Sequence, residues 1–375
     1  MLNAFDDGQF TLGLFLDLSK AFDTVDHQIL LTKLHQYGVR GTPLKWFENY
    51  LQNRQQFVQL NNESSSLKPI VCGVPQGSIL GPLLFLIYIN DLPRVVPGFK
   101  TILFADDSTF ICSHKDIVTL INMVNQHLQH ITNWLTANKL TLNISKTHYM
   151  IFHRHKKFTY PLPPLTLNNI ILHEVPTTKF LGVTIHKHLY WHKHIQDITN
   201  KISKQCGILY LIRDSLNAKS LNLIYYSLIY SNLLYCQTVW GAASLEALNP
   251  LIVAQKRVIR TMARLRKRDH TNDTFHNLRI LKVIDVNRVA CASFVYKCLH
   301  GLIENVCNFT HINTEYNIRN NTELRLPLMR TTQSQTNIRH HGPKIYNEIP
   351  AQIKNKPTVS SFKRSLKKYL IDSYR

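Results

Sequence analysis

Two adjacent carboxylates between apolar runs are the most chemically suggestive feature of the sequence. Asp106 and Asp107 follow the apolar run 101–104 and precede a second one at 108–112. Both runs are rich in β-branched and aromatic residues, which predicts a β-hairpin with the acidic pair at its turn. Adjacent like charges repel, so a compensating positive charge is expected, and a pair of divalent cations would supply it. An exposed acidic turn without a function is the alternative at this point.

A third carboxylate, Asp17, ends another predicted strand. Residues 11–18 are almost entirely apolar and predict a buried strand that ends near Asp17. Phosphoryl transfer uses two divalent ions about 3.5–4 Å apart, which activate the attacking oxygen and stabilise the leaving one. Hard cations prefer carboxylate oxygens, and Mg²⁺ takes only one or two of them from a protein. Asp17 on a strand beside the acidic hairpin would supply such a site.

Strands and helices alternate through the first half of the chain and would position these carboxylates. Asp23 and Asp26 are expected to cap a helix that closes around Gly38, and Thr42 followed by a proline starts the next helix. The further predicted elements are a hairpin over 55–72, a loop rich in Gly and Pro at 73–78, a buried helix over 79–92, a helix over 116–137, a strand–turn–strand over 141–152 and a short strand over 179–185.

The second half of the chain is mostly helical and strongly basic. Residues 201–375 carry 27 Lys and Arg against 10 Asp and Glu, whereas residues 1–200 carry 17 against 13. An excess of positive charge indicates a polyanionic partner, nucleic acid first and a membrane surface second. The predicted helices span 195–215, 218–235, 246–265 and 361–374, and the polar segment 305–345 is expected to be loosely ordered.

Composition excludes several other classes of protein. The chain has 375 residues and a net charge of +21, with no run of about 20 apolar residues and no basic start followed by an apolar core. No membrane span and no secretory signal are therefore expected. Seven cysteines without a Cys-x-x-Cys pair favour reduced thiols inside the cell over a disulfide framework or a structural zinc site.

Five short motifs, in order along the chain, resemble those of reverse transcriptases. Residues 16–23 with 25–26 resemble motif A, and 73–78 with 81–82 and Phe85 resemble motif B. Residues 104–107 resemble motif C, Asn143 with 146–147 looks like motif D, and 180–183 looks like motif E. The closest likeness is to the enzymes of non-LTR (LINE-type) retrotransposons, and the C-terminal residues 342–350 and 362–367 look like those of Jockey- or chicken-repeat-like elements.

This resemblance implies a fold and a reaction. The fold would be α+β, with a right-hand polymerase palm made of an antiparallel sheet and packed helices, followed by a helical thumb. The expected divisions are a palm with residual fingers elements at 1–190, a thumb at 191–300 and a basic C-terminal segment at 301–375. The reaction would be RNA-directed DNA synthesis from dNTPs on a DNA primer and an RNA template, with two Mg²⁺ ions for which Mn²⁺ is a substitute.

The resemblance also assigns roles around the three aspartates. Asp17 and Asp106 would hold the metals together with the backbone carbonyl of Leu18, and Asp107 would complete the acidic cluster. Lys146 would lie near the triphosphate as a cation or as a proton donor to the leaving pyrophosphate. A solvated turn lysine is the alternative for Lys146.

Further roles concern the nucleotide and the primer. The ring of Phe22 would screen the sugar 2′ position and favour dNTPs by steric clash. Gln76 and Gly77 would line the nucleotide and template side, where a missing side chain lets the backbone approach the substrate. Core packing for Phe22, and ordinary loop chemistry for Gln76 and Gly77, are the alternatives. The hairpin that grips the primer end would contain Phe180, Leu181, Gly182 and Val183.

The chain also departs from the family pattern. Motif A begins by residue 17, whereas relatives place fingers strands, and commonly an endonuclease, before it. We therefore expect a truncated chain with weak or absent polymerisation. A catalytically inactive nucleic-acid-binding remnant is the competing function, while Phe22 and Ala105 disfavour an RNA-directed RNA polymerase. A nuclear location is expected only from where a retroelement acts, because no localisation signal is evident.

Overall fold

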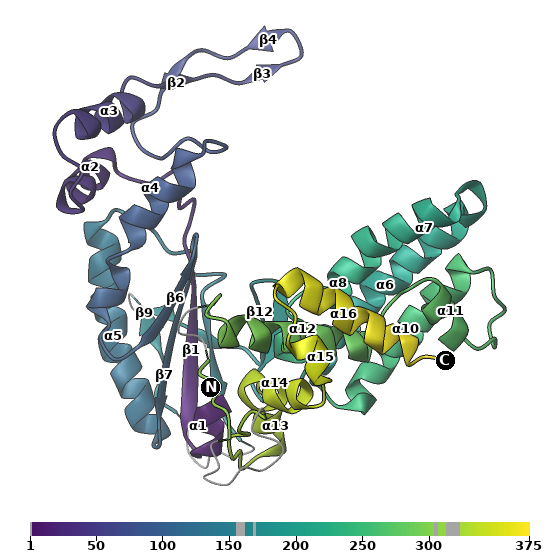
Figure 1. Cartoon of the computed structure of the whole chain (residues 1–375). Helices are drawn as coiled ribbons and strands as arrows, with labels where there is room; N and C mark the ends of the chain where they lie inside the picture. Colours follow the sequence, from purple (N-terminus) through teal and green to yellow (C-terminus); the bar gives the residue numbers. More distant parts are fainter. Residues whose placement is uncertain (1, 155–161, 168–169, 304–306, 313–322) are drawn as a thin grey trace. The chain divides into compact units, whose positions relative to one another are not determined.

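A computed structural model describes residues 2–154, 162–167, 170–303, 307–312 and 323–375. The chain forms two compact units, residues 3–176 and residues 177–375. A five-stranded sheet lies in the first unit, and helices dominate the second (Figure 1). The predicted mixed α+β class is confirmed at this level. No helix within the described ranges is both long and apolar enough to cross a membrane.

The sheet of the first unit is built around β1 (Phe10–Asp17). Its neighbours are β7 (Asp107–His114) on one side and β8 (His148–Phe152) on the other, both antiparallel to it. The edge strands are β6 (Lys100–Phe104), antiparallel to β7, and β11 (His173–Glu174). β11 runs parallel to β8, so the sheet is not fully antiparallel as predicted. Residues of β1 are buried on both faces, which explains its unbroken apolar sequence.

Two helices pack with this sheet in one hydrophobic core. α4 (Leu80–Ile89) and α5 (Ile117–Ala137) contribute many of the core residues together with β1 and β7. In Figure 1 both helices lie along one side of the sheet. α5 has a regular apolar stripe, and the side chain of Asp116 caps it by accepting a hydrogen bond from the backbone N–H of Thr119 at 2.7 Å.

The outer side of α4 corrects one prediction. The sequence 79–92 is apolar nearly all round and was expected to form a fully buried helix. Leu84, Phe85 and Tyr88 are fully buried, but Leu83 is 50% and Leu86 is 47% exposed. The reason is that only one side of α4 packs in the core of this unit, so apolar residues on the other side remain in contact with solvent.

The remaining elements of the first unit are short. These elements are α1 (Leu2–Asp6), α2 (His27–Gln36), α3 (Thr42–Leu51), η1 (Leu92–Val95), the ribbon β2 (Gln55–Gln56) with β5 (Lys68–Pro69), its tip β3 (Gln59–Leu60) with β4 (Glu63–Ser64), and the pair β9 (Thr166–Leu167) with β10 (Ile170–Ile171). Asp26 caps α2, and its carboxylate accepts from the backbone N–H of Gln28 and of Ile29 at 3.0 Å each. The predicted hairpin over 55–72 is confirmed by the two paired ribbons.

The second unit begins with a hairpin and continues as helices. The hairpin is β12 (Thr177–Phe180) with β13 (Val183–His186), so 179–185 is not one strand but two strands around a turn. The helices are α6 (His192–Ile212), η2 (Arg213–Ser215), α7 (Ala218–Ile224), a π-helical turn (Tyr225–Tyr230), α8 (Ser231–Leu234), α9 (Gln237–Trp240), α10 (Leu245–Met262), α11 (Asn272–Asn277), α12 (Val283–Leu299), α13 (Thr332–Gln335), α14 (Ile338–Asn347), α15 (Ala351–Lys354) and α16 (Val359–Asp372).

The boundaries of the units differ from the predicted divisions. The first unit ends at residue 176 rather than 190, because the β12–β13 hairpin bonds to α6: the Thr184 hydroxyl donates to Asp197 at 3.0 Å and its N–H to His194 at 3.2 Å. One hydrophobic core joins residues from α6 to α16, so residues 191–300 and 301–375 pack together within the second unit. Part of the segment 305–345, expected to be loose, is helical in α13 and α14, and part lies outside the described residues.

Candidate active site

The sheet register brings two of the predicted carboxylates together. Asp17 ends β1, Asp107 begins β7, and the two residues are direct partners in the antiparallel pairing. Ala105 and Asp106 form the two-residue turn between β6 and β7, as the hairpin prediction required. Ala105 has a φ of +51°, a left-handed conformation that a non-glycine residue rarely adopts. Asp17 and Asp107 therefore lie at the same end of two neighbouring strands, and Asp106 lies in the adjoining turn.

The end of β1 is held on its other side by the segment that resembles motif D. The N–H of Asn143 donates to the carbonyl of Asp17, and the N–H of Ser19 donates to the carbonyl of Thr141, both at 2.8 Å. These two bonds flank the bridge between Leu18 and Leu142 and do not use the carbonyl of Leu18. The carbonyl predicted to bind metal is therefore not occupied by this bridge.

The same segment brings one cation to the carboxylates. Lys146 follows the turn after Asn143, and its Nζ lies 3.5 Å from Oδ2 of Asp17. The Lys146 side chain is 67% exposed, so this ion pair by itself stabilises the fold very little. Its position beside the carboxylates is what matters for chemistry.

The pKa of Asp107 is shifted by its burial and by the neighbouring carboxylates. Partial burial, followed by the negative charges of Asp106 and Asp17, raises the pKa of Asp107, while Lys146 acts in the opposite direction. The charge of Lys146 does not offset burial and the two negative charges, so the pKa of Asp107 stays above its usual value. An approaching divalent cation would relieve the repulsion that remains.

The donor set suits Mg²⁺ or Mn²⁺ in its chemistry. Three carboxylates and one backbone carbonyl are hard oxygen donors of the kind these ions prefer. Within the described ranges, however, no three His, Cys, Asp or Glu side chains converge closely enough to form a ready-made metal site. Bound ions would therefore complete their coordination with water and substrate phosphates, as Mg²⁺ commonly does.

The predicted nucleotide-side residues lie on two loops of the first unit. The half-buried ring of Phe22 packs against Phe85 with ring centroids 4.7 Å apart. Gln76 is exposed, and its Nε2 donates to Oδ1 of Asp23 at 2.7 Å. Gly77 has a φ of +81° with open space where a side chain would be. Asp23 thus bonds to a loop, and only Asp26 caps the helix, which corrects half of that prediction.

The predicted primer-end residues form the turn of the β12–β13 hairpin. Phe180 and Val183 are paired, and Leu181 and Gly182 between them have φ of +44° and +80°. The Tyr235 hydroxyl donates to the carbonyl of Leu181 at 2.6 Å. A Cβ at Gly182 would lie 3.2 Å from the Tyr235 ring, so the glycine allows this ring to pack against the turn.

Comparisons with known proteins decide the family. Residues 3–185 match the family described as reverse transcriptase (RNA-dependent DNA polymerase). Residues 3–185 belong to the reverse transcriptase family. The match includes every motif on which the prediction was based, and the predicted family is confirmed.

Relatives of this reverse transcriptase domain come from mobile elements of Drosophila melanogaster. The RNA-directed DNA polymerase from mobile element jockey is 27% identical over 297 residues, which cover 76% of this chain and 32% of that protein. The probable RNA-directed DNA polymerase from transposon BS is 27% identical over 278 residues, which cover 70% and 30%. The chain thus spans about a third of the length of these relatives.

Similarity to solved structures is much lower. A telomerase from Candida albicans aligns with a TM-score of 0.35 and 12% identity, covering 81% of this chain and 52% of that one. A score at this level carries no argument about either fold or function.

The contacts of three residues at these sites were not predicted from the sequence. Thr147 lies next to Lys146, and its hydroxyl donates to the carbonyl of Asn143 at 2.9 Å. Asp23 was interpreted only as a helix cap, and Tyr235 was not singled out at all. Thr147 had a signal in its motif, whereas Tyr235 has none, because it meets Leu181 only through folding over 54 residues of chain.

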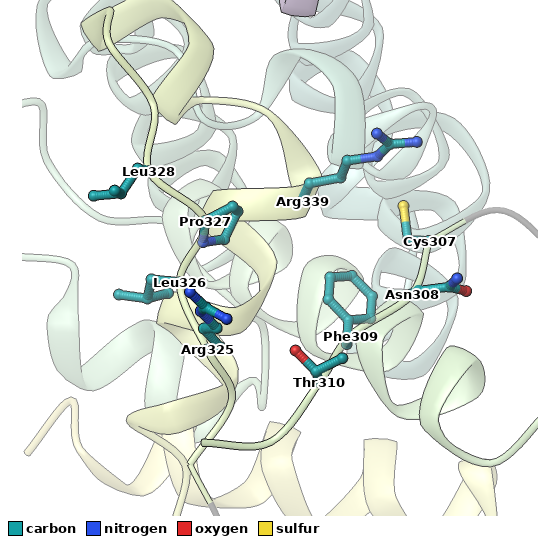
Figure 2. A pocket seen from close by; sticks show the side chains of 9 residues that line it. All are labelled: Cys307, Asn308, Phe309, Thr310, Arg325, Leu326, Pro327, Leu328 and Arg339. Atoms are coloured by element: carbon teal, nitrogen blue, oxygen red, sulfur yellow. The ribbon is translucent and has the colours of Figure 1, made fainter. Parts of the chain in front are cut away.

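A separate basic pocket of about 570 Å³ lies in the C-terminal part of the second unit (Figure 2). Two arginines, Arg325 and Arg339, line it, and Arg339 comes from the first turn of α14. No acidic side chain is among its described lining residues, which are Cys307, Asn308, Phe309, Thr310, Arg325, Leu326, Pro327, Leu328 and Arg339. The pocket offers positive charge and an aromatic ring without a carboxylate to neutralise it.

Proposed function

We propose that this chain is the RNA-directed DNA polymerase part of a non-LTR retrotransposon protein. The observation that carries the proposal is the direct pairing of Asp17 with Asp107, with Lys146 Nζ 3.5 Å from Asp17. The membership of residues 3–185 in the reverse transcriptase family supports it. In this proposal residues 1–190 are the palm with residual fingers elements, residues 191–300 are the thumb, and 301–375 are a basic C-terminal segment. The chain would act in the nucleus, where a retroelement copies itself into chromosomal DNA.

The carboxylates would hold the catalytic metals. Asp17, Asp106 and Asp107, with the carbonyl of Leu18, are the proposed ligands of two Mg²⁺ ions, which Mn²⁺ can replace. When bound, these ions would supply Lewis acidity to the primer 3′ oxygen and to the leaving pyrophosphate. The raised pKa of Asp107 fits this role, because a carboxylate destabilised by partial burial and by its neighbours' negative charge gains most from a nearby cation.

The other residues would bind and orient the substrates. Lys146 would contact the triphosphate and donate a proton to the pyrophosphate as it leaves. Phe22, held against Phe85, would present a fixed edge of its ring to the sugar 2′ position. Gln76 and Gly77 would line the nucleotide and template side.

We propose that the β12–β13 hairpin of the second unit grips the primer end through Phe180, Leu181, Gly182 and Val183. The hydrogen bond from Tyr235 to Leu181 supports it, because the bond holds a turn that would otherwise be free to move.

Primer extension on an RNA template tests the proposal. The wild type is compared with Asp106→Asn/Asp107→Asn and with Asp7→Asn, which removes an exposed carboxylate from the same unit. We expect Mg²⁺-dependent extension by the wild type and by Asp7→Asn. The double variant should lose at least about a hundredfold in rate, since it removes most of the transition-state charge compensation. Extension by the double variant at the wild-type rate would refute the assignment.

A second candidate function, nucleic-acid binding without catalysis, is favoured by the basic pocket and by the charge of residues 201–375. Binding of an RNA–DNA duplex by the wild type and by the double variant, measured across a salt series, distinguishes the two functions. Equal salt-sensitive binding without extension by either protein would support this candidate over the polymerase.

A further inference from the structure

Two loops of the reverse transcriptase domain are joined by backbone contacts. The N–H of Val74 donates to the carbonyl of Phe22 at 2.8 Å, and the N–H of Gly73 donates to the carbonyl of Val25 at 2.7 Å. Gly73 lies directly against the backbone of Asp23, since a Cβ there would be 2.8–3.0 Å from three of its backbone atoms. These contacts hold the loops 22–25 and 73–76 together.

A side-chain hydrogen bond also joins the two loops, at the residue proposed to face the nucleotide. Nε2 of Gln76 donates to Oδ1 of Asp23 at 2.7 Å, a short distance typical of a charge-assisted bond. A free glutamine amide can present either its NH₂ or its oxygen to a partner, because the two ends have nearly the same shape. An ionised carboxylate only accepts hydrogen bonds, so Asp23 selects the NH₂ end.

The other end of the Gln76 amide is then always the oxygen. With Nε2 bonded to Asp23, Oε1 of Gln76 is turned away from that carboxylate and is available as an acceptor. No hydrogen bond to this oxygen is found within the described part of the chain. Both side chains are exposed, so a substrate can reach them.

We propose that Asp23 is a positioning residue that makes Gln76 an obligate hydrogen-bond acceptor for the substrate. The proposal rests on the proposed polymerase function. The partner would be a hydroxyl donor, carried either by the sugar of the incoming nucleotide or by the ribose of the template strand. Asp23 itself would touch neither of them and would act only through Gln76.

Two substitutions separate this role from a merely structural one. Asp23→Asn removes the acceptor-only partner, so Gln76 can turn either end to the substrate. Asp23→Lys keeps a hydrogen bond between the two loops, because the lysine Nζ only donates and can bond only to Oε1 of Gln76. The loop contact is then kept while the NH₂ of Gln76 faces the substrate.

The expected results are specific to positioning. Asp23→Asn should lower kcat/KM for dNTPs about tenfold, chiefly through KM, and Asp23→Glu should recover part of the loss. Asp23→Lys should lose at least as much, whereas a structural role predicts that the kept loop contact preserves activity. Wild-type kcat/KM in Asp23→Asn or in Asp23→Lys would overturn the inference. Asp7→Asn is the matched control and should behave as the wild type.

Further arms identify the donor. If a nucleotide hydroxyl is the donor, Asp23→Asn should reduce the preference for dNTPs over 2′,3′-dideoxynucleotides. If the template ribose is the donor, it should reduce the preference for RNA over DNA templates. A variant that changes neither preference overturns the inference.

Lack of extension by the wild type would refute the proposed function without deciding the role of Asp23. Equilibrium binding of dNTP to the protein–template–primer complex then decides it. Wild-type affinity in Asp23→Asn refutes the inference, and affinity reduced about tenfold supports it.

Discussion

Replacing Gly73 with alanine should weaken the first unit at the point where the loops 22–25 and 73–76 meet. Gly73 has a φ of +90°, and its missing side chain is what lets it lie against the backbone of Asp23. An alanine Cβ would be 2.8 Å from the carbonyl oxygen and 2.9 Å from the Cα of Asp23. Backbone atoms cannot rotate away as a flexible side chain can, so one of the two loops must shift.

The magnitude follows from two terms. A non-glycine residue in the left-handed region costs about 1–2 kcal/mol. Forcing an extra carbon into a filled space costs about 1–3 kcal/mol. The more restricted unfolded chain of the alanine variant offsets about 0.4–1 kcal/mol of this. Together these ranges give about 1–5 kcal/mol, and at their middle the free energy of unfolding of the first unit should fall by about 3 kcal/mol.

Gly77→Ala provides a matched control. Gly77 also has a positive φ, +81°, but nothing lies within 4 Å of the position of its Cβ. The variant keeps the backbone strain and lacks the clash, so we expect a loss of about 1 kcal/mol. The difference between the two variants isolates the close approach of Gly73 to Asp23.

Hydrogen exchange read by mass spectrometry is the appropriate assay, because a chain of two compact units need not unfold in one step. Peptides from β1 report on the first unit. In Gly73→Ala their slowest exchange should accelerate by about 30-fold or more, and in Gly77→Ala by about fivefold, since 1.4 kcal/mol corresponds to a factor of ten. Equal acceleration in both variants would refute the reasoning, because strain alone would then explain the loss.

Two further predictions concern side chains whose environment changes their energetics. Asp107→Asn should raise the stability of the first unit at pH 7 by less than about 1 kcal/mol, because Asp107 is largely exposed. The pKa of Asp107 is raised in the folded state, so its carboxylate lowers stability only above pH 3.8; the gain should vanish in urea titrations at pH 3. Tyr374→Phe removes a hydroxyl that donates to Asp285 at 2.6 Å, and should lower the unfolding free energy of the second unit by about 1–3 kcal/mol in the same exchange assay. Tyr369→Phe, at a residue 47% exposed, is its control and should change little; equal losses in the two variants would contradict the role of the buried bond.

Local signals in the sequence predicted most of the elements that carry the candidate site. The apolar run ending at Asp17 and the hairpin around Asp106 have strand patterns that short-range physics determines, and the structure has both. Asp26 and Asp116 were placed at helix starts by the same reasoning, and both cap helices. These features depend on residues close together in the chain.

Apart from the placement of Asp17 beside the acidic hairpin, features that depend on long-range contacts were not predicted. The bond from Gln76 to Asp23 joins residues 53 apart, and the bond from Tyr235 to Leu181 joins residues 54 apart. Nothing near Asp23 distinguishes a helix cap from a partner of another loop. The two-residue strand β11 is too short to show a period, so its parallel pairing is likewise invisible in the sequence.

The pairing of Asp17 with Asp107 has a consequence for how this gene can change with time. Side chains of a strand alternate between faces, so one added or removed residue within β1 turns every later side chain to the opposite face. After deletion of Phe15, for example, β1 could keep the pairing of residues 10–14 or the pairing of Asp17 with Asp107, but not both. A substitution in these strands leaves this register unchanged, whereas a single in-frame codon gained or lost within β1 should separate Asp17 from Asp107.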